Sequence, residues 1–71
     1  MPTLEELNQR LRCLGWRTFD KERQLKSGRW CLYAYSCGHI IVALADSRRG
    51  AWSAAYLMAM KLTRNGLMRR D

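Results

Sequence analysis

Two runs of β-favouring residues, 30–36 and 39–46, flank the dipeptide Cys37-Gly38. Such a dipeptide predicts a tight hairpin turn, because glycine takes the positive φ that the turn needs without steric cost. Both faces of this hairpin are apolar, whereas an antiparallel sheet with one wet face normally alternates apolar and polar residues. We therefore expect the second face to be covered, by a second copy or by a partner, unless the short sheet simply exposes a few small apolar residues. The pattern does not decide which face is the core. One face carries Tyr35, Tyr33, Cys31, Ile40, Val42 and Leu44, and the other Trp30, Leu32, Ala34, Ala45, Ala43 and Ile41.

Residues 3–14 carry the pattern of an amphipathic helix. Thr3 and Glu6 form the capping box T-x-x-E, and the leucines that follow recur at spacings of one helix face. Gly15 fits the position after the helix, where a left-handed backbone is favoured. The leucine face consists of Leu4, Leu7, Leu11 and Leu14.

A second helix is predicted over 47–65, where Asp46 or Ser47 can cap the first turn. Apolar residues at helical spacing define the side that we expect to face the sheet. This inward stripe consists of Ala51, Ala55, Met58, Ala59 and Leu62.

Between the helices, residues 16–24 alternate as a strand does, and their charged far end suits a sheet edge. The fold class is therefore α+β in the order α-β-β-β-α, a three-stranded antiparallel sheet with two helices on one face. A length of 71 residues gives one small domain, which we place at 1–66, followed by a basic tail at 67–71. No apolar stretch approaches the ~20 residues of a membrane span. The acidic start lacks the apolar segment of a signal peptide, so we expect a soluble cytoplasmic protein.

The charge distribution indicates the kind of partner. Thirteen basic residues stand against six acidic ones, a net charge of +7, and ten of the thirteen are arginine, whose planar set of donors matches phosphate. Residues 47–71 hold six basic groups and one acidic group, a net charge of +5. This asymmetry predicts an anionic partner: nucleic acid first, an acidic protein surface second, an anionic membrane last.

No pattern predicts catalysis, a metal site or a cofactor. Cys31 lies six residues before Cys37 along the strand, or ~20 Å at ~3.3 Å per residue, too far to share a zinc ion with ~2.3 Å bonds to sulfur. His39 lacks a third group that would orient it as a base for Cys37. With Cys13 the cysteines number three, an odd count that does not favour a disulfide framework. We therefore expect a protein that is not an enzyme.

The start of the second predicted helix carries a candidate phosphate site. Arg48 and Arg49 stand where free backbone N–H groups and the positive end of the helix dipole attract an anion. Basic residues there destabilise the helix itself, so a bound anion would explain them. The alternative is that both are solvated side chains of a first turn. Lys26 and Arg29, in the turn before the hairpin, are further candidates for backbone contacts.

Seven residues of the same helix follow the pattern S-R-R-x-A-x-x-x-A-x-x-x-A-M: Ser47, Arg48, Arg49, Ala51, Ala55, Ala59 and Met60. The segment 47–60 resembles the second helix of the double-stranded RNA-binding domain, which opens S-K-K-x-A-K-x-x-A-A-x-x-A-L. This resemblance implies the α-β-β-β-α fold and a role for Arg48 and Arg49 in gripping RNA phosphates. Trp52 replaces the third basic residue of the family and Tyr56 replaces a small alanine. Residues 26–29 lack the family's G-P-x-H motif, which reaches a minor groove.

The first functional hypothesis is a small, basic, non-catalytic nucleic-acid-binding module. Its backbone contacts would come from Arg48, Arg49, Lys26 and Arg29. A duplex is favoured over a single strand, and both RNA and DNA remain open. In a variant of this hypothesis, Tyr33, Tyr35 or Trp30 stack on the bases of a single strand, unless these rings belong to the core.

The second hypothesis is a phage or mobile-element accessory protein that blocks a host nucleic-acid-handling complex by binding its acidic surface. The chain resembles anti-CRISPR proteins in size and character. Its contacts would come from Trp52, Tyr56, Leu57, Met60 and Trp30, because aromatic residues and methionine are enriched in interface cores. The two apolar hairpin faces also predict a homodimer at micromolar concentration.

Overall fold

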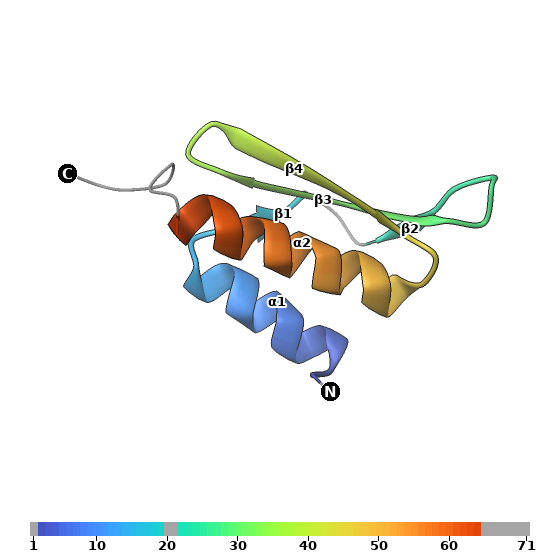
Figure 1. Cartoon of the computed structure of the whole chain (residues 1–71), viewed down its shortest axis with the longest axis horizontal. Helices are drawn as coiled ribbons and strands as arrows, with labels where there is room; N and C mark the ends of the chain where they lie inside the picture. The colour runs from blue at the N-terminus through green and yellow to red at the C-terminus, as the bar shows by residue number, and fades with distance from the viewer. Residues whose placement is uncertain (1, 20–21, 65–71) are drawn as a thin grey trace.

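The chain folds into two layers, an antiparallel sheet and two helices that pack on one of its faces (Figure 1). The computed structural model describes residues 2–19 and 22–64. The predicted α+β class and the helix–strands–helix order are confirmed, whereas the predicted tail at 67–71 lies outside the described residues. In chain order the elements are α1 (Leu4–Cys13), β1 (Arg17–Thr18), β2 (Arg23–Gln24), β3 (Trp30–Ser36), β4 (His39–Ala45) and α2 (Arg48–Arg64).

Helix α1 begins and ends where its sequence predicts. The N–H of Glu6 donates to Thr3 Oγ1 at 3.1 Å, and the Glu6 carboxylate accepts from the N–H of Thr3 at 3.3 Å, which completes the capping box. Gly15 follows the helix with a φ of 92°. Leu7 and Leu11 are buried, and the other two leucines of the face pack against the core.

The hairpin of β3 and β4 has the predicted register. Tyr35 lies opposite Ile40 and Tyr33 opposite Val42. Cys37 and Gly38 form the turn with φ values of 47° and 85°, the left-handed conformations that a two-residue hairpin turn requires.

The single strand predicted over 16–24 is wrong, because two short strands take its place. Strand β1 pairs Thr18 with Ala34, and β2 pairs Arg23 with Cys31. Four residues, 19–22, therefore span a stretch in which β3 has only two, so a regular ladder cannot continue. Of these four, residues 20 and 21 lie outside the described residues.

The structure decides which sheet face is the core. Leu32, Ala34, Ile41 and Ala43 are buried beneath the helices. The opposite face, called the outer face here, is not covered by any helix or strand of the described residues (Figure 1). It exposes Phe19, Tyr33, Tyr35, Ile40, Val42 and Leu44.

Helix α2 faces the sheet with a stripe of alanines. Ala51, Ala55 and Ala59 are fully buried, as predicted. Met58 was expected in the same stripe and is instead 42% exposed, while Trp52 is only 7% exposed. The buried face is thus rotated towards Trp52, since a large indole buries more apolar area than a thioether.

Two indoles hold α2 near its ends. Trp52 Nε1 donates to Glu22 Oε1 at 2.8 Å, and Trp16 Nε1 donates to Thr63 Oγ1 at 3.3 Å. The Glu22 side chain is 9% exposed and also pairs with Arg48 at 3.4 Å. Glu22, which directly precedes β2, thus brings a carboxylate to the start of α2.

Leu11→Ala tests the placement of α1. Because Leu11 is fully buried, its truncation should lower the free energy of unfolding by about 2–5 kcal/mol and Tm by at least about 8 °C. Leu57→Ala, at a position that is 60% exposed, is the control and should melt like the wild type. Equal Tm values for the two variants, measured by circular dichroism, would contradict the packing of α1.

Glu22 should stabilise the fold through Trp52 more than through Arg48. Glu22→Ala leaves the indole N–H without its acceptor, which should lower the free energy of unfolding by about 1–3 kcal/mol. Glu22→Gln keeps an acceptor oxygen for the indole and loses only the ion pair with Arg48, whose side chain is 54% exposed. The free energy of unfolding of this variant should therefore fall by no more than about 1 kcal/mol. Urea unfolding measures both, and equal losses in the two variants would contradict this division.

Candidate nucleic-acid interface

The start of α2 has the geometry of a capped helix. The N–H of Gly50 donates to Ser47 Oγ at 3.0 Å, and the N–H of Ala51 donates to the Ser47 carbonyl at 3.0 Å. The first turn contains no acidic residue. Arg48 and Arg49 are both exposed there, where the helix dipole favours an anion.

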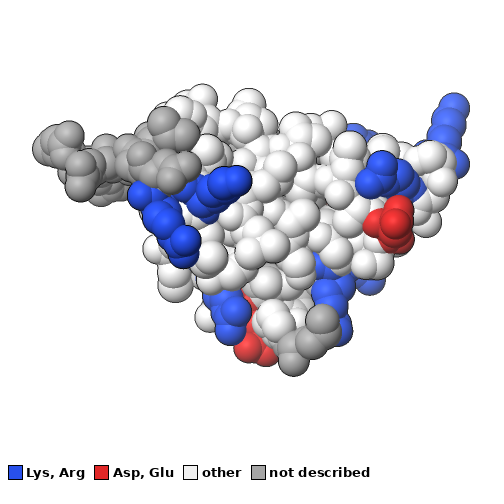
Figure 2. Space-filling model, in the orientation of Figure 1, with Lys and Arg blue, Asp and Glu red and all other residues white. Residues whose placement is uncertain are grey.

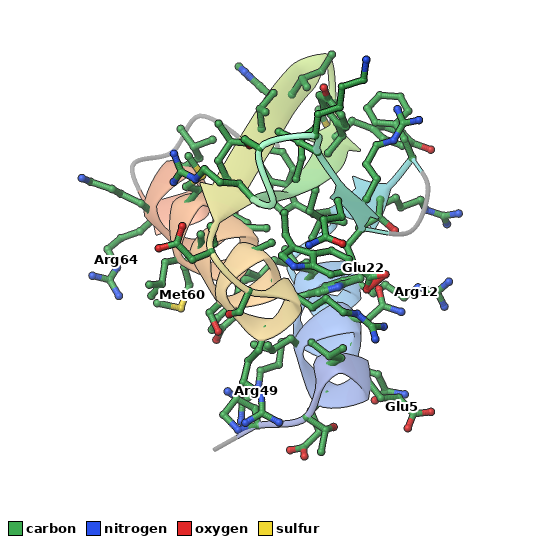
Figure 3. All side chains as sticks on the ribbon, turned by 90° about the vertical axis from the view of Figure 1, so that its right-hand side faces the viewer. Glu5, Arg12, Glu22, Arg49, Met60 and Arg64 are labelled. Carbon is green, nitrogen blue, oxygen red and sulfur yellow. The ribbon has the colours of Figure 1, made fainter. Side chains whose placement is uncertain are left out.

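A carboxylate already occupies the surroundings of Arg48. The Arg48 guanidinium lies 3.4 Å from Glu22 Oε1 and 5.8 Å from the centre of the Trp30 ring. The adjoining hollow is lined by Glu5 and Glu22 as well as by Arg48, and these carboxylates would repel a phosphate. Figure 3 shows Arg49 well apart from Glu22.

The other two predicted backbone contacts lie at the same end of the sheet as Arg48. Arg29 pairs with Asp46 at 3.5 Å, with both side chains exposed. Lys26 is exposed in the turn between β2 and β3. The fold therefore brings Arg29 and Arg48 to one end, yet each of the two faces an acidic side chain of the chain itself.

The residues predicted to contact a protein do not form one surface. Trp52 belongs to the core at 7% exposure, so its expected place on the surface is wrong. Trp30 and Tyr56 are half-buried against the core, and Tyr56 turns towards α1, where Arg10 lies 5.8 Å from its ring centre. Met60 is half-buried, and Leu57 alone of the five is well exposed.

The outer face carries three exposed aromatic side chains. Phe19, Tyr33 and Tyr35 are 58%, 40% and 38% exposed. The rings of Phe19 and Tyr35 lie 4.5 Å apart at 37°. The sequence leaves Tyr33 and Tyr35 open as stacking residues or as core residues, and in the structure both lie on the exposed outer face. Phe19 was not considered, although strand alternation puts it on the same side as Arg17.

Two arginines border these aromatic rings. Arg17 lies opposite Tyr35 and Arg23 opposite Cys31, and residues directly opposite each other share a sheet face. Both arginines are exposed. We call Arg17, Phe19, Arg23, Tyr33 and Tyr35 the aromatic platform.

The described carboxylates lie away from the aromatic platform. Glu5 and Glu6 belong to α1, on the other side of the sheet. Glu22 accepts a hydrogen bond from the buried Trp52. Asp46 pairs with Arg29 at one end of the sheet. The described residues on and around the aromatic platform therefore carry a net positive charge.

The neighbouring Cys31 raises the pKa of Tyr33. A side-chain hydrogen bond with Cys31, followed by the charge interaction with Cys31, raises the pKa of Tyr33 above its ordinary value, and Arg23 opposes the shift. A tyrosine hydroxyl has an ordinary pKa of about 10, so it is protonated near neutral pH even without this upward shift. No negative charge from Tyr33 therefore arises on the platform at that pH.

The comparisons assign no family. Residues 2–19 and 22–64 contain no group of three or more histidine, cysteine, aspartate or glutamate side chains that could hold a metal ion. No helix within those ranges is long and apolar enough to span a membrane. The sequence matches no protein-family model, and neither the curated proteins nor the solved structures that were searched contain a match to it.

Proposed function

We propose that this chain is a small, basic, non-catalytic nucleic-acid-binding module that binds a single strand across its outer sheet face. The observation that carries the proposal is the exposure of Phe19, Tyr33 and Tyr35 side by side with Arg17 and Arg23. Aromatic side chains flanked by basic ones are the usual means of holding single strands, because every base has a face that can stack.

Each part of the platform has a separate task in this proposal. The rings of Tyr33 and Tyr35, two residues apart on one strand, stack on successive bases, and Phe19 supports Tyr35 from the neighbouring strand. Arg17 and Arg23 contact the phosphates, whose contribution weakens as salt rises. The neutral phenol of Tyr33 adds no repulsion.

The resemblance to the double-stranded RNA-binding domain supports a different mode, in which a duplex lies at the start of α2. The α-β-β-β-α order agrees with that family. Arg48, however, is held by Glu22, and Arg29 by Asp46. A phosphate would have to displace these carboxylates, so the platform is the better supported site.

Removal of the aromatic rings should weaken single-strand binding. For Tyr33→Ala and Tyr35→Ala we expect losses of about 5- to 150-fold each, because stacking one base contributes about 1–3 kcal/mol. Tyr33→Phe retains the ring and is the matched control, expected to bind like the wild type. Fluorescence anisotropy with labelled oligouridine and oligothymidine measures the affinities.

The arginines of the platform should set the salt dependence. Arg17→Ala and Arg23→Ala should each lower the slope of log K against log salt by about 0.7 for a single strand. The double variant Arg48→Ala/Arg49→Ala should leave that slope unchanged. If duplex binding instead depended on Arg48 and Arg49 and not on Tyr33, the site would lie at α2.

The absence of binding would also be informative. If neither single strands nor duplexes bound at low salt, nucleic-acid binding would be overturned. The accessory-protein hypothesis would then be the one to pursue, with the exposed aliphatic residues of β4 as its contact.

A further inference from the structure

Strand β4 leaves one edge of the sheet open. It pairs with β3 on one side, and no strand within residues 2–19 and 22–64 pairs with its other side. Sheet edges are usually protected by charges, proline, bulges or a covering loop. The stretch 40–45 contains neither a charge nor a proline, and β4 pairs with β3 without a bulge. A further strand can therefore add to this edge.

The hairpin turn determines which residues direct their backbone groups to the open edge. Because Cys37 and Gly38 both have positive φ, the turn is a two-residue turn in which the carbonyl of Ser36 accepts from the N–H of His39. Hydrogen-bonded and non-hydrogen-bonded pairs alternate along antiparallel strands from there. The residues whose N–H and C=O groups point away from β3 are therefore Ile40, Val42 and Leu44.

A hydrogen bond on the other side of β3 gives the same assignment. The N–H of Phe19 donates to the carbonyl of Tyr33 at 3.3 Å, so Tyr33 turns that carbonyl away from β4. Tyr33 lies opposite Val42, and both residues of a non-hydrogen-bonded pair turn their backbone groups away from each other. Val42 therefore presents its N–H and C=O at the open edge.

We propose that β4 pairs antiparallel with β4 of a second copy of this chain, about a two-fold axis at Val42. In this register Val42 faces Val42 of the second copy, and Ile40 faces Leu44 of the second copy. The three pairs form about six backbone hydrogen bonds. If the two β4 strands were shifted by one residue, Ile40, Val42 and Leu44 would face residues whose backbone N–H and C=O groups already bond to β3. A larger shift would lose one of the three hydrogen-bonded pairs. Because such a two-fold contact is closed, association stops at the dimer.

Apolar side chains on both sides of the strand suit this partner. Above the edge, Ile40, Val42 and Leu44 are 62%, 44% and 46% exposed and would meet the same three residues of the second copy. Figure 2 shows an uncharged surface across the middle of the molecule, where β4 and α2 lie in Figure 1. Below the edge, a groove of about 450 Å³ is lined by Ile40, Ile41, Val42, Met58, Lys61 and Leu62.

The contact area indicates a weak dimer. Seven paired residues extend ~23 Å, and a sheet with a helix beneath it is ~15–20 Å deep. The strip covers ~400 Å² per copy, or ~800 Å² in total, which is below the ~1,200–2,000 Å² of stable specific interfaces and in the range of weak, transient contacts. Each copy carries a net charge of +7, so added salt should strengthen the dimer by screening their repulsion.

Sedimentation equilibrium of the purified chain without nucleic acid tests the dimer. We expect a monomer–dimer equilibrium in the micromolar range that tightens as salt rises. This trend is opposite to that of nucleic-acid binding, which weakens with salt, so failure of either proposal is distinguishable from failure of the other. A monomer at all concentrations and at both low and high salt would overturn the dimer.

Charge substitutions test the register. Val42→Lys places two ammonium groups opposite each other and should weaken association about tenfold or more. Ile40→Lys and Leu44→Glu should each weaken it, and combining them in one chain should restore it, because the introduced ammonium then faces the introduced carboxylate of the second copy. Leu57→Lys, on α2 outside the groove, is the matched control and should not alter association. A double variant no better than the single ones would overturn the register.

Tyr33→Lys separates edge pairing from stacking of two outer faces. Tyr33 lies on the outer face of β3, away from the open edge, so an edge dimer should keep its affinity. Association lost in Tyr33→Lys but retained in Val42→Lys would overturn edge pairing. Circular dichroism of every variant confirms that the exposed substitutions leave the fold intact.

Discussion

The contact between α2 and the sheet depends on small side chains. Ala51, Ala55 and Ala59 on the helix belong to one buried cluster with Ala34 and Ala43 on the strands, and all five are almost inaccessible to solvent. Small residues on both sides let the two layers approach closely, which increases dispersion contacts along the whole helix. One indole forms a hydrogen bond near each end of α2. The rest of the fold is arranged around this closely packed helix.

This arrangement separates charges that stabilise the fold from charges that remain open to a partner. Glu22 reaches the start of α2 to satisfy the Trp52 indole, and Arg48 is held as a consequence. The basic residues that most resemble a phosphate site are therefore partly engaged in stability. Arg17 and Arg23, which lie in short strands and belong to no recognisable motif, stand instead beside exposed aromatic rings.

The sequence predicts the local elements well and the side of burial poorly. The capping box of Thr3 and the Cys37-Gly38 turn rest on short-range chemistry, so α1 and the hairpin register follow from them. The two hairpin faces are similarly apolar, so alternation alone could not identify the core. In α2 the abundance of alanine makes the stripe ambiguous. Trp52 and not Met58 is buried, because the indole buries more apolar area and its N–H finds an acceptor in Glu22. Alternation puts Phe19 on the side of Arg17, but it does not show that this side lies beside Tyr35, because that depends on the pairing of β1 with β3.

The place of the aromatic platform within the sheet has a consequence for ligand geometry. Its members lie on β3 and on the short strands beyond it, on the side away from β4. A two-fold axis at β4 would put the two platforms on the same face of one continuous sheet. Along the strands, the two platforms would run in opposite directions. A nucleic-acid strand has a chemical direction, so one straight strand could not lie on both platforms in the same sense. A looped strand, or two strands running in opposite directions, could occupy both, and the second contact would then benefit from a high effective concentration.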